Sequence, residues 1–404
     1  MRHARAALAV SFFVHGTLFA LLVTRIPAIQ HHYGISNGLL PVFLAAVPIL
    51  AGFSSVATER LVKRVRPSVV LRWVQPGVGL ALIGLGAGDQ LWMAVATLAL
   101  FGVCIGGLDS SVNMLGVSLQ GAYGRSIMLS IHAAHSFGAI LGASLAWSGA
   151  HWHLSLFTLY GPTALVLIPL ALAASRWYRD REPDDRLSHD GVSREKAGKP
   201  GLGGGQVVMK LLLPLCLVMA VAFIGEGTVS NWSAKYLQDT LHSSEQLSTV
   251  PFAVYMVMSL IGRSTGDFGV RRFGSGPVVR LGTVVAVAGF AAVAVAPGAW
   301  TGILGFTMVG LGLCVLVPQT FAAAGRMFPL ASDSAIARLN IFNYVGFVVG
   351  SPLVGAVGGL WSYRVAMIVP AVLVAVTLLF AKSFDAGPVG YGAVHERPRT
   401  ADVA

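Results

Sequence analysis

Long apolar runs separated by short polar, glycine or proline clusters dominate this chain of 404 residues. A helix needs about 20 apolar residues to cross roughly 30 Å of hydrocarbon. No alternation of apolar and polar positions, as in strands of a β-barrel, interrupts the runs. The pattern therefore predicts an all-α membrane protein with twelve transmembrane helices, near residues 6–29, 36–57, 67–87, 91–118, 129–149, 155–175, 208–234, 247–268, 277–296, 301–324, 337–357 and 363–382.

A polar stretch in the middle of the chain divides these spans six and six. Residues 176–206 mix acidic, basic and glycine residues and cannot form an apolar core. The expected organisation is therefore two bundles, a linker and a tail. Their ranges are 1–175 for the N-terminal six-helix bundle, 176–207 for a cytoplasmic linker, 208–382 for the C-terminal six-helix bundle and 383–404 for a cytoplasmic tail.

The two halves resemble each other at a shift of roughly 207 residues. The first span ends in residues 24–27 and is followed by a short turn and residues 36–39; the seventh ends near Asn231 and Trp232 and is followed by a comparable turn and residues 244–247. Two bundles of equal topology can rock around a site at their interface, as alternating access requires. The alternative is the general likeness that any two polytopic halves share.

Composition supports lipid as the solvent. With 55% hydrophobic and 11% charged residues, the chain cannot cover a water-soluble globule with polar side chains. The net charge of +11 does not indicate a nucleic-acid partner, because the basic residues lie between apolar runs and not on one soluble face. There is no P-loop for ATP-driven transport. Three cysteines within apolar runs, without CxxC spacing, are expected to be core residues; a disulfide or metal role is the alternative.

The distribution of lysine and arginine predicts the orientation. If the N-terminus is cytoplasmic, the outer turns contain only Lys235 and Arg364, and the other inter-span basic residues face the cytoplasm. This is the asymmetry of the positive-inside rule, so both termini are expected on the cytoplasmic side of the inner membrane. Arg2 and Arg5 precede an apolar run that is too long for a secretory signal and lacks a cleavage site, so the run is predicted to be the first span.

Several segments resemble the major facilitator superfamily, in particular its YbjJ-type branch near the fucose-permease-like sugar transporters. They lie in order along nearly the whole chain, at residues 20–29, 106–113, 131–138, 225–232 and 262–266. The resemblance implies two pseudo-symmetric six-helix bundles and secondary active transport. No enzymatic activity, cofactor or metal is expected.

The loop signature of this superfamily, between spans two and three, is matched by one acid and three bases. Glu59 takes the acidic position, followed by Arg60, Lys63 and Arg64, with Ser55 in place of the first glycine. In the superfamily this signature contributes an ion-pair latch to the closed cytoplasmic face. The resemblance therefore assigns these residues to gating.

The equivalent loop between spans eight and nine departs from the signature. It keeps Gly266, Arg272 and Gly274 but has Arg271 where the acid belongs. The departure removes one of the expected latches unless Asp267 substitutes. Arg271 and Arg272 are the residues of this loop that are assigned to gating. The Gly-Pro signature of drug/proton antiporters is also missing from span five, so motifs do not establish multidrug export.

Two acidic residues, Asp109 and Glu226, lie well inside apolar spans. A charge at the bilayer centre costs on the order of 3 kcal/mol, so such residues usually face a polar cavity. Asn113 shares a helix face with Asp109 at i, i+4. In fucose-permease-like transporters the matching acid contributes to proton and sugar binding, which makes Asp109 a candidate for proton coupling and Asn113 for substrate binding. A structural hydrogen-bonding role is the alternative for Asp109.

Glu226, Asn231 and Trp232 lie in the outer half of the seventh span, which by resemblance lines the cavity. A carboxylate, an amide and an indole can bind a polar ligand or can cap the helix end. Arg25, in the outer third of the first span, can bind an anionic group or pair with Glu226. Its alternative is snorkelling to the interface.

Three histidines lie within predicted spans. Imidazoles titrate near neutral pH, so His132 and His135 are candidates for proton relay, and His15 for substrate binding. His132 and His135 are spaced i, i+3, but a zinc site needs further ligands that the sequence does not place.

Together these features predict a proton-coupled transporter of a small organic solute, with membrane lipid, substrate and protons as partners, acting as a monomer. A composition rich in alanine, glycine and arginine resembles that of high-GC bacteria, where such chains export secondary metabolites, and this favours export. Proton-coupled uptake of a sugar-like solute is the alternative within the class. A non-transporting membrane receptor or scaffold is the alternative of another class.

Overall fold

A computed structural model describes residues 1–36, 39–180, 203–244, 247, 250–329 and 332–385. All regular secondary structure in these ranges is helical, and ten of the helices are long and apolar enough to cross a membrane. Most of the predicted linker and nearly all of the predicted tail lie outside the described residues. The predicted all-α membrane fold is confirmed.

The helices of the first half correspond to the first six predicted spans. They are α1 (Arg2–Thr24), α2 (Ile26–His32), α3 (Leu40–Leu61), α4 (Pro67–Ala87), α5 (Leu91–Tyr123), α6 (Met128–His151) and α7 (Leu156–Ala174), followed by the short η1 (Ser175–Trp177). The second half contains α9 (Gly203–Lys235), η2 (Tyr236–Thr240), α11 (Val250–Phe273), α12 (Ser275–Ala294), α13 (Ala299–Leu313), α14 (Leu316–Met327), α15 (Ser332–Leu360), α16 (Tyr363–Val376) and η3 (Thr377–Phe384).

Every predicted span is helical, although the helix ends differ from the predicted ones. The two spans outside the ten apolar helices are α3 and α11, of 22 and 24 residues, and α11 contains the charged Arg263 and Asp267. Helix α9 begins at Gly203, inside the range predicted as linker, and α15 begins five residues before its predicted span, at Ser332.

Two predicted spans are each broken into two helices near a proline. The first span breaks at Arg25, two residues before Pro27, and the tenth breaks between α13 and α14, just before Pro318. Proline has no backbone N–H, so the carbonyl four residues earlier loses its helical partner. For Pro318 that carbonyl belongs to Cys314, and it accepts a hydrogen bond from Arg263 Nε instead, at 3.3 Å.

Glycines allow close contact between helices inside each half. A Cβ at Gly138 of α6 would overlap the carbonyl oxygen of Phe13 in α1, and one at Gly106 of α5 would overlap that of Ala51 in α3. Such positions let two backbones approach each other directly. The pairs α1 with α6 and α3 with α5 therefore pack too tightly for a larger residue at either glycine.

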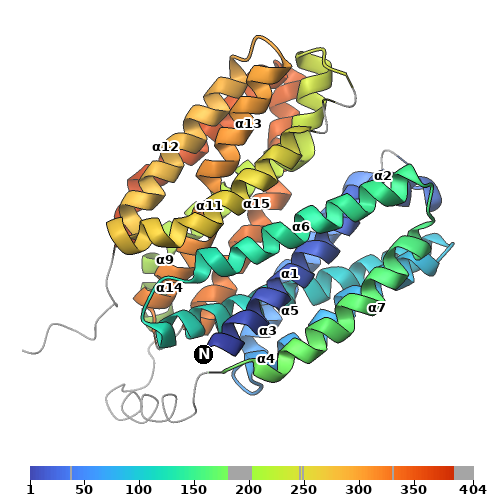
Figure 1. Cartoon of the computed structure of the whole chain (residues 1–404). Helices are drawn as coiled ribbons and strands as arrows, with labels where there is room; N and C mark the ends of the chain where they lie inside the picture. Colours follow the sequence, from blue (N-terminus) through green and yellow to red (C-terminus); the bar gives the residue numbers. More distant parts are fainter. Residues whose placement is uncertain (37–38, 181–202, 245–246, 248–249, 330–331, 386–404) are drawn as a thin grey trace, which may run out of the picture.

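Most buried apolar side chains belong to two large clusters, one mainly from α1–α7 and the other mainly from α9–η3. Figure 1 shows the two halves close together near the N-terminus and farther apart toward α2. We call these two ends of the molecule the Met1 end and the α2 end. Because each half has its own apolar core, the interface between the halves is where polar groups can gather.

Candidate functional site

A cavity of about 820 Å³ lies between the two halves. Helices α1, α3, α5 and α6 line it from one half, and α9, α11, α14 and α15 from the other. Ile26 and Ile29 of α2 are also part of the lining, so the cavity extends to the α2 end. Its lining includes eight of the residues predicted for proton coupling or substrate binding: His15, Asp109, Asn113, His132, His135, Glu226, Asn231 and Trp232.

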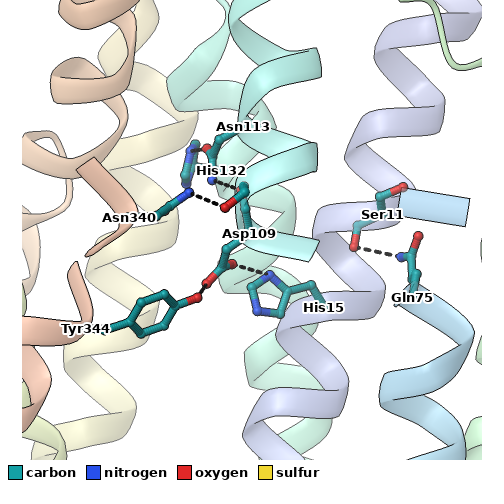
Figure 2. A network of polar contacts seen from close by, with 9 residues as sticks. Ser11, His15, Gln75, Asp109, Asn113, His132, Asn340 and Tyr344 are labelled. Atoms are coloured by element: carbon teal, nitrogen blue, oxygen red, sulfur yellow. Dashed lines mark hydrogen bonds and ion pairs between the residues drawn. The ribbon is translucent and has the colours of Figure 1, made fainter. Parts of the chain in front are cut away.

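The Asp109 carboxylate connects the two halves of the molecule. The Tyr344 hydroxyl, from α15, donates a hydrogen bond to Asp109 Oδ2 at 2.5 Å. His15 Nδ1, from α1, lies 3.4 Å from the other carboxylate oxygen. Figure 2 shows the carboxylate between these two side chains. Asp109 therefore contacts a titratable imidazole on its own half and a hydrogen-bond donor on the other.

Asn113 does not orient the Asp109 carboxyl group. Its side-chain N–H donates to the backbone carbonyl of Asp109 at 2.8 Å, and its carbonyl oxygen lies 3.1 Å from His132 Nε2. His132 is thereby fixed by an amide from α5, whereas the His135 ring lies against His15 with centroids 4.8 Å apart. His15 therefore connects the Asp109 carboxylate with His135, and Asn113 connects the Asp109 backbone with His132.

Glu226 has different electrostatic partners, and both belong to α11. Tyr255 and Arg263 are the groups that interact with its carboxylate. The Arg263 guanidinium is 7% exposed and donates to Ser136 Oγ of α6 at 2.7 Å, so it also bridges the halves. Arg263 was not among the predicted site residues, although an arginine inside an apolar run carries the same signal as a buried acid.

The remaining predicted ligand residues differ in their availability. Trp232 lines the cavity, but its indole N–H is already bonded to Ser351. Asn231 lines the cavity with an exposed side chain. Arg25 is not part of the cavity lining and makes no ion pair with Glu226; its Nε is buried without a partner in the part of the chain described.

Polar contacts close the space between the halves on the Met1 side of Asp109. Asn340 of α15 donates to Ser110 Oγ at 3.3 Å. Ser55 of α3 donates to the carbonyl oxygen of Ala337 at 3.0 Å. These side chains are fully buried. They join α3 and α5 to α15 where the cavity ends on the Met1 side, and Asn340 is itself part of its lining.

Two carboxylates close the Met1 end at pseudo-equivalent places. Asp267 of α11 accepts hydrogen bonds from the Ser126 hydroxyl at 2.6 Å and the Ser130 N–H at 2.9 Å, at the start of α6. Glu59 of α3 accepts one from the Ser334 hydroxyl at the start of α15. We call these contacts the Asp267 latch and the Glu59 latch. Each places an acid of one half at a helix N-terminus of the other, where the helix dipole favours negative charge.

The basic residues predicted for gating make fewer contacts across the Met1 end than the two carboxylates do. Arg338, which was not predicted, lies 3.9 Å from Glu59. Arg271 donates to the carbonyl oxygen of Ser126 at 3.3 Å and so lies next to the Asp267 latch. The other predicted gating bases have exposed side chains and no ion pair within the described ranges: Arg60, Lys63, Arg64 and Arg272.

Comparison with known proteins identifies the family. Residues 8–304 and, in a second match, 215–399 fit the sequence profile of the Major Facilitator Superfamily. The chain therefore belongs to the major facilitator superfamily, whose members are membrane transporters and not enzymes.

The similar proteins are mostly described as transporters. The chain is 24% identical to uncharacterized transporter y4wD of Sinorhizobium fredii over 92% of its length and 96% of the relative. It is 27% identical to an uncharacterized MFS-type transporter of Yersinia pestis over 88% of its length and 89% of the relative. It is 23% identical to the multi-drug resistance efflux pump PmrA homolog of Lactococcus lactis over 92% and 91%.

Among solved structures, the transporter FucP in its outward conformation is similar in fold. The TM-score is 0.74 at 16% identity, covering 94% of this chain and 98% of FucP. A related structure is described as the fucose:proton symporter of E. coli. The fold and the superfamily are thus established, and this chain is a multi-pass membrane transporter of a small molecule.

Proposed function

We propose that this chain couples proton movement to the transport of a small organic solute by alternating access, with Asp109 as the proton-binding group. The Asp109 carboxylate supports this most directly, because it lies in the cavity and is bonded to Tyr344 from the opposite half. A charge change at this point acts on both the cavity and the contact between the halves.

The coupling follows from hydrogen-bond strength. An ionised carboxylate accepts a stronger hydrogen bond than a neutral acid. Proton binding to Asp109 therefore weakens the bond from Tyr344 and favours separation of α15 from α5. That separation opens the Met1 end. His15, at 3.4 Å, is the nearest titratable partner for delivering or accepting the proton, with His135 next to it and His132 as the further relay group.

We propose that both termini lie on the cytoplasmic side of the inner membrane, because the distribution of basic residues along the sequence favours this orientation. In this orientation the α2 end faces outward, and the cavity described here opens to the outside. One chain supplies both walls of the cavity, so the transporter is proposed to act as a monomer.

The cavity lining favours an amphipathic solute. Most of the side chains are apolar or aromatic, among them Phe12, Phe223 and Phe347. Such a lining suits a ligand with a sizeable apolar part. We propose export as the direction, as for a secondary metabolite or antibiotic, and the relative described as a drug efflux pump homolog agrees with it.

Proton-coupled uptake of a sugar-like solute is the second candidate. The side-chain carbonyl oxygens of Asn340 and Asn343 are buried without a hydrogen-bond partner in the described chain, and both residues line the cavity. Unpaired buried acceptors are costly, and a ligand hydroxyl would satisfy them. A thermal-shift screen of the purified protein against sugars and metabolites identifies which class binds.

The test of proton coupling pairs two assays in proteoliposomes, using a ligand found in that screen. Asp109→Asn is expected to abolish transport driven by a proton gradient and to leave equilibrium counterflow, because the amide mimics the protonated acid. Tyr344→Phe is expected to reduce gradient-driven transport more than counterflow. Asp239→Asn, an exposed residue paired with Lys235, is the control and should behave as wild type.

Two outcomes contradict the proposal. Undiminished gradient-driven transport in Asp109→Asn would remove this residue from coupling and leave Glu226 as the next candidate. Ligand binding without flux in the wild-type protein would favour the non-transporting receptor.

A further inference from the structure

A second cavity, of about 390 Å³, lies at the Met1 end, outside the space between the two halves. Three arginines line it, and none of the lining residues is acidic. The lining consists of Arg2, Arg5, Ala6, Ala9, Tyr123, Arg125, Ser130 and Ile131. These residues come from the start of α1, the end of α5 and the start of α6. The proposed transport cycle makes no use of this cavity.

The local structure brings the arginines together. Arg2 and Arg5 are separated by nearly one turn in the first turns of α1 and point to the same side. Helix α5 ends at Gly124, in the left-handed region at φ 64°, which turns the chain and places Arg125 at the same cavity. The Tyr123 ring lies under the Arg125 guanidinium, 5.6 Å from its centroid. Arg5 Nη2 donates to Ser130 Oγ at 2.9 Å.

The charge of this cluster is not balanced by the described residues. None of the three guanidiniums forms an ion pair there. Asp267, which accepts hydrogen bonds from Ser126 and Ser130, makes no ion pair with these guanidiniums. Gln120 and Asp267 already accept from the first N–H groups of α6. Three like charges around one cavity repel one another, and a bound anion would relieve that repulsion.

We propose that this cavity binds a phosphate-bearing anion. The planar guanidinium matches a phosphate in two parallel hydrogen bonds, and three of them around one cavity can share its oxygens. The headgroup of an anionic lipid and free phosphate are the two sources of this chemistry. The lipid is favoured by position, because the cavity lies where α1 and α6 begin and has the apolar Ala6, Ala9 and Ile131 beside the arginines.

The experiment measures thermal unfolding of the purified full-length protein in a neutral detergent. The probes are dioctanoyl phosphatidylglycerol, dioctanoyl phosphatidylcholine and inorganic phosphate at matched ionic strength. Phosphatidylglycerol is expected to raise the unfolding midpoint in a saturable way, and phosphatidylcholine is expected to leave it unchanged. Saturation by inorganic phosphate, with no further effect of phosphatidylglycerol, would support the site and assign free phosphate as its source.

Two variants that lose the same charge distinguish the effect of the cavity arginines from the effect of general surface charge on phosphatidylglycerol binding. The cavity variant replaces Arg2, Arg5 and Arg125 by glutamine. The control replaces Arg66, Arg176 and Lys382, which are exposed at the same end but do not line the cavity. The cavity variant is expected to require about tenfold more phosphatidylglycerol for half-saturation, and the control about as much as wild type.

Arg125→Gln alone changes one exposed side chain and can be used if the triple variant does not fold. It is expected to raise the phosphatidylglycerol concentration required for half-saturation about threefold. An equal response to phosphatidylcholine would overturn the proposal. The proposal would also be overturned if neither phosphatidylglycerol nor inorganic phosphate raised the unfolding midpoint. The same holds if the cavity variants reached half-saturation at the wild-type concentration, or if the control lost affinity for phosphatidylglycerol as much as the cavity variant.

Discussion

The Asp267 latch has a measurable role in the equilibrium between the closed and open Met1 end. Its carboxylate is 3% exposed and accepts two hydrogen bonds from the opposite half. Asp267→Asn removes the charge and leaves one oxygen to accept. A hydrogen bond to a charged group contributes about 1.5–3 kcal/mol, and burial limits screening by water. When the Met1 end opens, water replaces both hydrogen-bond partners of Asp267. The substitution therefore destabilises only the closed state.

A loss of about 1.5–3 kcal/mol corresponds to a roughly 10–100-fold shift of the population toward an open Met1 end. Glu59→Gln is expected to shift the same equilibrium less. Its carboxylate is more exposed, and Arg338 lies at 3.9 Å, where an ion pair contributes about 0–1 kcal/mol. The ranking of the two variants therefore follows from burial and hydrogen-bond number.

Distances between spin labels at Ala122 and Phe273 report this opening. Both side chains are exposed, one near the end of α5 and the other at the end of α11, on opposite sides of the latch. The three native cysteines are buried, which limits labelling elsewhere. Asp239→Asn, at the α2 end, is the control. An unchanged distance distribution in Asp267→Asn would refute a role for this latch in closure.

Two further predictions concern packing and topology. Gly138→Val is expected to lower the unfolding temperature strongly or prevent folding, because any Cβ there overlaps the Phe13 carbonyl. The control Gly121→Ala has open space around it and should change the stability by about 1 kcal/mol or less. Equal unfolding temperatures of the two variants in detergent would contradict the close packing at Gly138. An impermeant thiol reagent applied to intact cells is expected to label a cysteine that replaces Asp239. It is expected to label a cysteine that replaces Lys210 only after the membrane is permeabilised. Labelling of the Lys210 variant in intact cells would contradict the predicted orientation.

Sequence patterns were sufficient for the fold because membrane helices satisfy their backbone hydrogen bonds locally. Apolar runs, together with the polar, glycine and proline clusters that separate them, located all twelve spans. The breaks at Arg25 and before Pro318 were missed. A proline near a span end predicts a break only if the chain changes direction there, and this depends on the neighbouring helices.

The candidate site was only partly accessible from the sequence. Asp109 and Glu226 were identifiable because a buried acid inside an apolar run is rare. Tyr344 and Asn340 gave no such signal, since both are uncharged and their partners lie more than 200 positions away. Asp267 was recognised as a possible substitute for the missing acid, but the loop pattern did not show that it binds the start of α6.

The sequence by itself determined the membrane environment, the number of spans, the two related halves and the buried acids Asp109 and Glu226, because each depends on hydrophobicity and spacing along the chain. Only the tertiary structure decided which side chains meet across the two halves. The Asp109–Tyr344 bond, the latches and the arginine cavity each combine residues from helices whose rotation and register are set by packing of whole bundles. Local pattern does not specify that packing, and so it does not specify the polar contacts.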